Sequence, residues 1–168
     1  MTRENHRLQW LVFEGPACKY YWRRIMHRTR KSKKAYNPDS KRALYKSNPN
    51  ACPFCDMSAI EIVAKGKLTL VVRNIFPYEY WEFMDVTDHL LVIPKRHVSS
   101  LGQLTKDEKL ETMEILAKYE AQSYNIYART ADNNMKTIPH QHTHLIKTND
   151  KLAKAVLYSQ KPYFVWKV

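Results

Sequence analysis

Three histidines stand at every second position of one short segment, at His140, His142 and His144. Successive side chains of a strand point to opposite faces, so this spacing would place all three imidazoles on one surface. Imidazole has an unperturbed pKa of about 6.5, so near neutral pH it can act as a nucleophile or as a proton donor. The pattern favours phosphoryl transfer through a histidine intermediate. Purely structural histidines and a metal site built from the triplet alone are the alternatives.

The cysteine pair Cys52-x-x-Cys55 is the second group whose spacing suits chemistry. Two thiolates at this spacing can converge on one ion and supply half of a tetrahedral zinc site. The chain holds three cysteines in all, too few for a disulfide scaffold, which favours metal binding in a reducing compartment. A redox dithiol and an incidental pair are the alternatives, and histidines would have to complete a zinc site.

Four apolar segments are expected to form the strands that position these residues, because β-branched and aromatic residues favour strands. They are residues 68–72, 89–93, 125–128 and 138–146. Pro94 is expected to end the second strand, and residues 163–166 are expected to add an edge strand.

One helix is expected to begin at Thr105, because Thr105 and Glu108 form the sequence signature of a capping box. Apolar residues follow at spacings of three and four and predict the buried face of this helix. They are Leu110, Met113, Ala117, Ala121 and Tyr124. One helix against an antiparallel sheet of about five strands is an α+β architecture.

The composition of the chain indicates a folded domain preceded by a basic segment. The 168 residues are 44% hydrophobic, enough for a sizeable core. Neither a bilayer-spanning apolar stretch nor a secretory signal is evident, so a cytoplasmic location without membrane contact is expected. Turn-forming residues before Cys52 predict a boundary between a basic N-terminal extension, residues 1–49, and a folded domain, residues 50–168, which contains the histidine triplet and would be the catalytic domain.

The positive charge is concentrated near the N-terminus. Residues 19–46 hold eleven Lys or Arg against the single acid Asp39, and so carry +10 of the net charge of +12. This segment could contact RNA or DNA, because its cations can neutralise phosphates and Tyr20, Tyr21 and Trp22 can stack on bases. A solvated face and a helix packed on the domain are the alternatives.

The order of the motifs resembles the histidine triad (HIT) family of nucleotide hydrolases and transferases. The resemblance rests on the triplet, on the segment from Asp88-His89 to His97-Val98, and on the turn at residues 73–78. It covers residues 50–148 and implies a HIT-like fold. It also implies a covalent nucleotidyl intermediate on His142.

The resemblance implies a role for several further residues. His144 would contact the α-phosphate, and His89 would lie behind the triad in a proton relay. The nucleotide would be bound by the ribose contact of Asn74, by Ile75 and Val72 at the base, and by Thr137 at the phosphate. Many members of the family are homodimers built on the helix that here begins near Thr105, which implies a second copy as partner.

In the zinc-bearing branch of the family, two histidines complete the metal site. The corresponding residues here are His97 and His140, which together with Cys52 and Cys55 would form a closed Cys2His2 zinc site. Such a site would leave His142 for chemistry.

The chain also departs from the family pattern. Gln141 and Thr143 are polar where apolar residues are usual, which predicts a less buried opposite face of the strand. Residues 132–136 replace a glycine-rich turn, Arg129 replaces a common phosphate-binding asparagine, and residues 79–87 lengthen a loop.

These inferences predict an enzyme, a nucleotide hydrolase or nucleotidyl transferase that acts at a nucleoside α-phosphate. Its substrate would be a phosphoramidate, a dinucleoside polyphosphate or a nucleotide conjugate. The alternative is a non-catalytic module that binds nucleotides, or binds nucleic acid through the basic segment.

Overall fold

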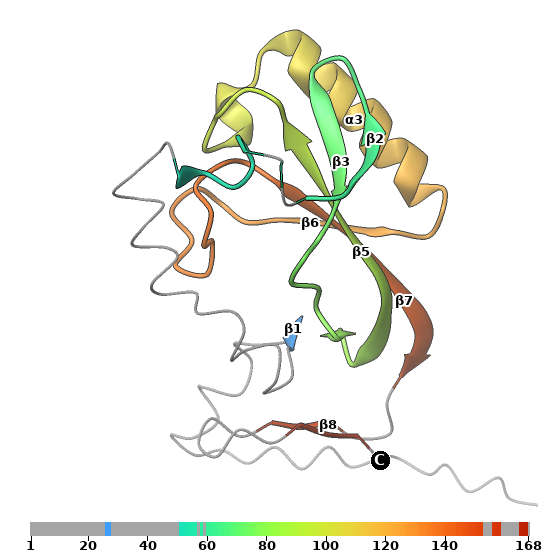
Figure 1. Ribbon diagram of the computed structural model, residues 1–168. Coiled ribbons are helices and arrows are strands. Elements are labelled where there is room, and N and C mark those ends of the chain that lie inside the picture. The colour runs from blue at the N-terminus through green and yellow to red at the C-terminus, as the bar shows by residue number, and fades with distance from the viewer. Residues whose placement is uncertain are drawn as a thin grey trace, which may run out of the picture.

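The computed structural model describes residues 26–27, 51–56, 58, 60–152, 156–158 and 165–167 of the chain. Within these residues one main helix packs against an antiparallel sheet (Figure 1). The strands are β1 Met26–His27, β2 Ile62–Lys65, β3 Thr69–Arg73, β4 Tyr80–Trp81, β5 Met84–Pro94, β6 Asn125–Ala128, β7 Thr143–Leu152, β8 Val156–Tyr158 and β9 Val165–Lys167. The helices are the 3-10 helix η3 Leu101–Gln103 and the α-helix α3 Lys106–Glu120. No helix of the described part is long and apolar enough to cross a membrane.

β5 lies at the centre of the main sheet. β5 pairs with β7 on one side and with β3 on the other, β6 extends the sheet beyond β7, and β2 extends it beyond β3. The short strand β4 pairs with the start of β5, and β1 pairs with β4. All these pairings are antiparallel. The predicted antiparallel sheet of about five strands with one helix is confirmed, and the strands β1, β2 and β4 are additions to those predicted.

The lengthened loop at residues 79–87 is a hairpin. β4 and the start of β5 pair as Tyr80 with Asp85 and Trp81 with Met84. The two residues between them, Glu82 and Phe83, have φ of 50° and 65°. Positive φ at both turn positions suits the right-handed twist of paired strands, although Gly and Asn usually occupy them. The loop is therefore an ordered extension of the sheet.

Met26–His27 of the basic extension pairs with β4. The extension therefore contributes a strand to the sheet across the predicted boundary at residue 49. Residues 1–25 and 28–50 lie outside the described residues, and so does almost all of segment 19–46. The predicted division into 1–49 and 50–168 and the contact of residues 19–46 with nucleic acid stay predictions.

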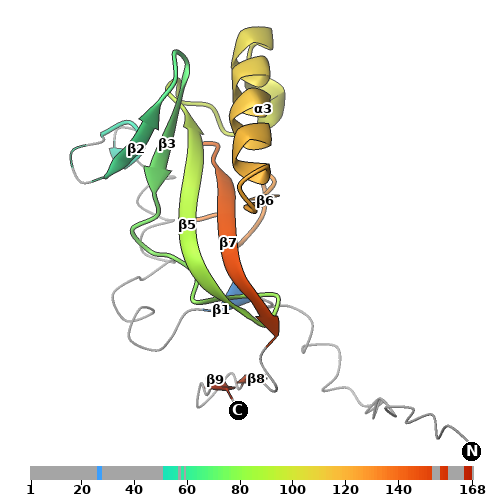
Figure 2. The ribbon, with the colours of Figure 1, turned by 90° about the vertical axis from the view of Figure 1, so that its right-hand side faces the viewer.

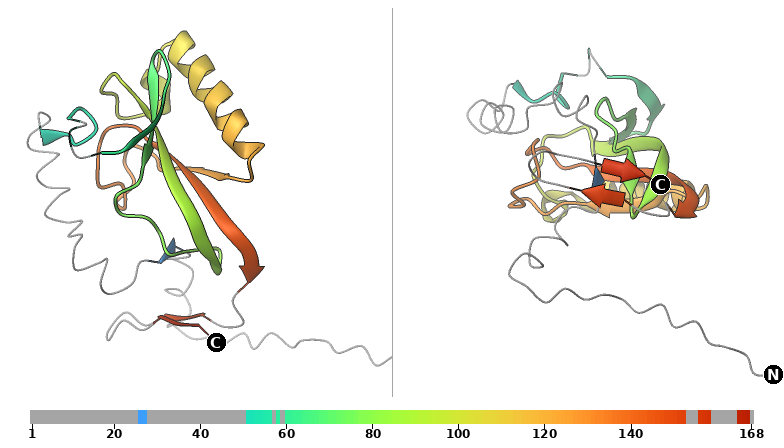
Figure 3. Two further views of the ribbon diagram at one scale, coloured as in Figure 1. Left: turned by 45° about the vertical axis from the view of Figure 1, so that its right-hand side comes forward. Right: turned by 90° about the horizontal axis from the view of Figure 1, so that it is seen from below.

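The C-terminal strand does not join the main sheet. β9 forms at Val165–Lys167, but it pairs with β8 in a separate two-stranded sheet (Figure 3). The predicted edge strand at residues 163–166 is therefore wrong in its partner, and residues 163–164 lie outside the described residues.

Helix α3 lies along one face of the sheet (Figure 2), but not with the predicted side. Leu110 and Met113 are 59% and 64% exposed, whereas Glu108, Thr112 and Leu116 are buried. The helix carries two stripes with the same period, and the stripe that includes Leu116 packs against the sheet. The stripe of Leu110 and Met113 faces outward.

Apolar residues cover both faces of the sheet. On the side of α3, the helix residue Leu116 packs on residues from three strands: Val71, Leu90, Val92 and Leu145. On the opposite side, the turn that carries the cysteine pair packs on the sheet, in a cluster formed by Cys52, Phe54, Leu70, Val72, Leu91 and Ile93. The cysteine turn is therefore anchored to the face away from the helix.

The start of α3 is tied to the loop that follows β5. Thr105 and Glu108 form the predicted capping box. The Glu108 carboxylate also accepts hydrogen bonds from Arg96, 3.0 Å from Nε and 2.6 Å from Nη2. The Arg96 hydrogen bonds, followed by the Thr105 backbone N–H, lower the pKa of Glu108 to about 2. Because Arg96 precedes His97, this buried carboxylate fixes the backbone that carries one predicted zinc ligand.

Replacing Glu108 with Gln should lower the free energy of unfolding at pH 7 by about 1–2 kcal/mol, since the charged partner of Arg96 and part of the cap are lost. The Glu108 pKa is lowered on folding, so its contribution is present above the ordinary value of 4.5 and is lost as pH falls toward 2. Denaturant titrations at pH 7 and pH 3 should therefore show a smaller difference between variant and parent at pH 3. An equal difference at both pH values would exclude the carboxylate charge as the cause.

Candidate active site

The histidine triplet straddles the start of a strand. β7 begins at Thr143, so the predicted strand 138–146 starts too early and only His144 of the triplet lies in it. The backbone N–H of Gln141 donates to the Val98 carbonyl, 2.6 Å away, and so joins the segment to the loop after β5. The His142 and His144 rings still lie 5.1 Å apart.

His142 has the protonation expected of a nucleophile. Its Nδ1 lies 2.8 Å from the His140 carbonyl oxygen, which can only accept, so Nδ1 carries the proton. Burial, opposed in part by this hydrogen bond, lowers the pKa of His142 to about 4, and the positive charge of Lys136 lowers it further. Near pH 7 the ring is therefore neutral, with the lone pair on Nε2.

A backbone amide sets the proton positions in His89 and His144. The N–H of Tyr78 donates to His89 Nδ1 at 3.0 Å, so this nitrogen is unprotonated and the proton of His89 is on Nε2. His89 Nε2 lies 2.9 Å from His144 Nδ1 and donates to it, which leaves the His144 proton on Nε2. His89 and His144, the residues predicted for the proton relay and the phosphate contact, are thus joined by a hydrogen bond whose direction the Tyr78 amide sets.

Asn74, the predicted ribose contact, lies next to His89. Its Oδ1 accepts from the backbone N–H of Phe76 at 3.0 Å, which fixes the orientation of the amide. Its Nδ2 then lies 3.2 Å from His89 Nε2. Asn74 and the relay histidine therefore lie side by side.

The other predicted nucleotide contacts differ in their exposure. Ile75 is 55% exposed and open to a ligand, whereas Val72 has no exposed surface and lies in the core below the cysteine turn. Thr137 is buried, and in the sequence it shortly precedes the histidine triplet. Val72 therefore lies beneath the surface and cannot contact a ligand directly in this structure.

The polar residues between the histidines are buried, so the expectation of a less buried opposite face is wrong. Gln141 is 2% and Thr143 4% exposed. The buried Lys136 compensates Gln141, because its Nζ donates to Gln141 Oε1 at 2.9 Å and to the Ser99 carbonyl at 2.8 Å. Burial lowers the pKa of Lys136. The hydrogen bonds of the Lys136 ammonium thus hold the segment that carries His140 and His142.

Two tyrosines pack on the ring of His144. Tyr78 stacks on it with 5.6 Å between ring centroids, and Tyr127, its neighbour across β6 and β7, lies at 5.8 Å. The Arg129 guanidinium contacts both tyrosines. Its Nη2 donates to the Tyr78 hydroxyl at 3.3 Å, and its Cζ lies 5.3 Å from the Tyr127 ring centroid. This places a cation beside the histidines.

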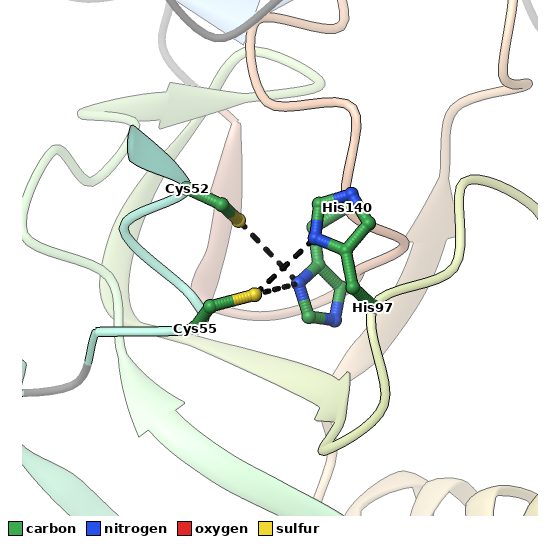
Figure 4. Close-up of side chains that lie close together, drawn as sticks. All are labelled: Cys52, Cys55, His97 and His140. Atoms are coloured by element: carbon green, nitrogen blue, oxygen red, sulfur yellow. Dashed lines mark hydrogen bonds between the residues drawn. The ribbon is translucent and has the colours of Figure 1, made fainter. Parts of the chain in front are cut away.

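The four predicted zinc ligands converge on one point. Cys52 and Cys55 come from the turn before β2, His97 from the loop after β5, and His140 from the segment before β7 (Figure 4). Their ligand atoms all lie within 4.8 Å of one another. Cys55 Sγ is 3.2 Å from His97 Nδ1, and Cys52 Sγ is 3.5 Å from His140 Nδ1. The cluster can hold a metal ion.

The surroundings of the cluster suit ligation. His140 Nε2 lies 2.9 Å from the Pro94 carbonyl oxygen, so its proton is on Nε2 and Nδ1 faces the thiols with its lone pair. Burial lowers the pKa of His140 to about 4 and raises that of Cys52 to about 11. A buried thiolate at Cys52 therefore needs a nearby cation, which a metal ion would supply.

Several contacts of the site could not be identified from residue types. Phe54, inside the cysteine turn, packs edge-on against both His140 and His142, at 5.9 Å and 5.3 Å. The sequence feature that could have indicated these contacts is its position between Cys52 and Cys55, two predicted zinc ligands. Tyr78 belongs to the turn at residues 73–78 that resembles the family, but its packing on His144 had no signal of its own. The role of Lys136 left no signal, because Lys136 lies in a loop whose fold is decided by distant residues.

Comparison with known proteins places residues 59–151 in a match to the family described as HIT domain, which is more than half of the chain. Among curated relatives, an AP-4-A phosphorylase of Mycobacterium tuberculosis is 35% identical over 83 residues, which cover 44% of this chain and 39% of the relative. The matched region thus spans about two fifths of that relative's length.

Two solved structures are similar to the chain. A hypothetical protein from Leishmania major is 25% identical with a TM-score of 0.51, covering 67% of this chain and 84% of that chain. A zinc-bound histidine triad family protein from Mycobacterium smegmatis is 20% identical with a TM-score of 0.48, covering 68% of this chain and 88% of that chain.

Proposed function

Because the chain belongs to the HIT domain family, we propose that it is a nucleotide hydrolase or nucleotidyl transferase whose covalent intermediate forms on His142. The observation that carries the proposal is the protonation of that ring. Its Nδ1 proton is held by the His140 carbonyl and its pKa is lowered to about 4. An unprotonated Nε2 at pH 7 is the form that attacks phosphorus.

In the proposed first step, His142 Nε2 forms a bond to the α-phosphorus of the nucleotide, and the bond to the leaving group breaks with its electron pair. His144 Nε2–H donates to a phosphate oxygen, where charge develops. His89 holds His144 in the required tautomer. In the second step, water or another acceptor displaces the histidine, and nucleoside monophosphate or its conjugate is released.

We propose that Cys52, Cys55, His97 and His140 hold a structural zinc ion. Tetrahedral zinc with Zn–S of about 2.3 Å and Zn–N of about 2.0–2.1 Å requires ligand atoms roughly 3.3–3.8 Å apart, and the Sγ–Nδ1 distances of 3.2–3.6 Å are compatible with this. The ion would join the cysteine turn to the segment that carries His142. All four positions are then filled by protein, so its role is structural.

The function is tested by incubating the full chain with a dinucleoside polyphosphate and, separately, with an adenosine phosphoramidate. Release of nucleoside monophosphate from either substrate supports the proposal. A second series contains inorganic phosphate, and release of nucleoside diphosphate there would identify phosphorolysis, the activity in the name of the M. tuberculosis relative. Nucleotide binding without any product would favour the non-catalytic binding module instead.

We also propose that the protein forms a homodimer through α3 and β6. The outward stripe of α3 exposes Leu110 and Met113, and Ile126 on β6 is 43% exposed. Among the described strands, β6 pairs only with β7, so its other edge can accept a neighbour. An apolar stripe beside an open strand edge suits a second copy of the same surface.

Replacing both Leu110 and Met113 with Asp should convert the dimer to a monomer, because two charges would be buried against an apolar surface. Analytical ultracentrifugation measures the change, and a weakening of at least about 100-fold is expected for two such groups. Lys118→Asp, on the flank of the same helix, is the control and should stay dimeric. A parent protein that sediments as a monomer at all micromolar concentrations would exclude this interface.

A further inference from the structure

Arg129 lies at the end of β6, the strand next to the one that follows the proposed nucleophile. β6 and β7 pair Tyr127 with His144 and Ala128 with Thr143. Arg129 directly follows Ala128, the last residue of β6, and His142 directly precedes Thr143, the first residue of β7. A cation is thus placed near the tyrosines that pack on His144, and the proposed mechanism assigns it no role.

The guanidinium is held in place by the tyrosines that pack on His144. A hydrogen bond to Tyr78 and a cation–π contact with Tyr127 are among the interactions that fix its position. Arg129 is partly exposed, so some of its surface remains available to a ligand. An arginine fixed in this way can present several N–H groups to a phosphate with little loss of side-chain entropy.

The second cation near His142, Lys136, is not in a comparable position. It is 5% exposed, and its ammonium donates to Ser99 and Gln141. Lys136 therefore holds the loop together, whereas Arg129 presents charge at the surface beside the histidines. This difference singles out Arg129 as the cation that can contact a substrate.

Arg129 would stabilise a phosphate leaving group but not an amine leaving group. When a P–O–P bond breaks, the electron pair goes to the bridging oxygen, and a phosphate or polyphosphate leaves with added negative charge that a guanidinium stabilises. When a P–N bond breaks, the leaving amine must gain a proton. Arginine remains protonated at all ordinary pH values and does not supply one.

We propose that Arg129 is a specificity-determining residue that favours substrates with a phosphate or polyphosphate leaving group over substrates with an amine leaving group. The inference rests on the proposed function and narrows its substrate class to nucleoside polyphosphates, dinucleoside polyphosphates included. In the balanced step, the His142 nitrogen bonds to the α-phosphorus, the bridging oxygen takes the electron pair, and the released polyphosphate lies against Arg129.

The test compares kcat/KM for a dinucleoside polyphosphate and for an adenosine phosphoramidate in the parent protein and three variants. Arg129→Asn should lower kcat/KM for the polyphosphate about 100-fold, the effect typical of one lost transition-state donor, and change that for the phosphoramidate less than threefold. Arg129→Lys should recover part of the loss. Lys147→Asn is the matched control, because Lys147 also lies over a tyrosine, Tyr124, 5.5 Å away.

A second measurement does not depend on turnover. Inorganic tripolyphosphate should bind the parent protein at least about tenfold more tightly than Arg129→Asn in calorimetry, since one charge-assisted contact is lost. Equal loss on both substrates in Arg129→Asn, or equal tripolyphosphate affinity, would overturn the inference. If the parent turns over neither substrate, the proposed function fails, and the tripolyphosphate comparison still decides whether Arg129 binds polyphosphate.

Discussion

Replacing His142 with Asn should reduce turnover by at least about 10³-fold, because covalent catalysis depends on one ring nitrogen that Asn does not provide. Asn is close in size and can still donate to the His140 carbonyl, which accepts from His142 Nδ1 in the structure. We therefore expect the fold, the zinc content and nucleotide binding to stay close to those of the parent. The measurement is a steady-state assay on the substrate that the parent turns over best.

Two further observations separate a nucleophile from a positioning residue at His142. Rapid quenching of the parent with radiolabelled substrate should trap a phosphoramidate on His142, stable to base and labile to acid, and this label should be missing from His142→Asn. His144→Asn should slow the reaction while still allowing label to accumulate. Substantial activity in His142→Asn, or label at another residue, would refute the mechanism.

The clustering of the two cysteines with His97 and His140 was predictable because the short spacing of the cysteines and the order of the family motifs agree. Cys52 and Cys55 are close in sequence, and their spacing alone brings two thiols together. His97 and His140 come from distant segments, so their assignment depended on the family resemblance. The sheet explains why the four side chains meet: β5 and β7 are neighbours, and His97 follows β5 and His140 precedes β7 at the same end of the sheet.

The packing of α3 could not be predicted, because two stripes of the helix have the same period. Leu110 and Met113 are more apolar than Glu108 and Thr112, yet the latter are buried. The Glu108 carboxylate can be buried because Arg96 donates hydrogen bonds to it. The stripe that contains Glu108 therefore faces the sheet, and the apolar stripe faces outward. The proposed dimer would account for the apolar surface that sequence periodicity assigned to the core.

The start of β7 shows a similar limit. Alternation of histidines indicated a strand from residue 138, but the segment before Thr143 bonds to Val98 and is held by Lys136. A buried lysine bonded to a glutamine five residues away is a tertiary feature, because neither residue type signals burial. The positions of His140 and His142 therefore depend on contacts that no local pattern encodes.

Loss of zinc should be the largest change in stability that a single substitution produces in this protein. The freshly purified chain should hold about one zinc per molecule, and Cys52→Ser should lose it. Cys52 is 2% exposed and packs with Phe54 and Val72, so the metal site and the core on this face form one unit. A structural zinc contributes to folding directly, and its loss should lower Tm by about 10–20 °C, equivalent to roughly 3–5 kcal/mol.

Matched variants separate the metal from the thiol and from catalysis. Cys18→Ser removes the third cysteine and should keep both zinc and Tm, whereas His142→Asn should lose activity and keep zinc. A chelator should lower the Tm of the parent to that of Cys52→Ser and leave Cys52→Ser unchanged, because the variant has no bound ion to remove. Metal analysis that finds no zinc in the parent, together with a Cys52–Cys55 disulfide, would replace the zinc site with a redox pair. The coupling of the cysteine turn to His142 through His140 would then have to come from Phe54, which contacts both histidine rings.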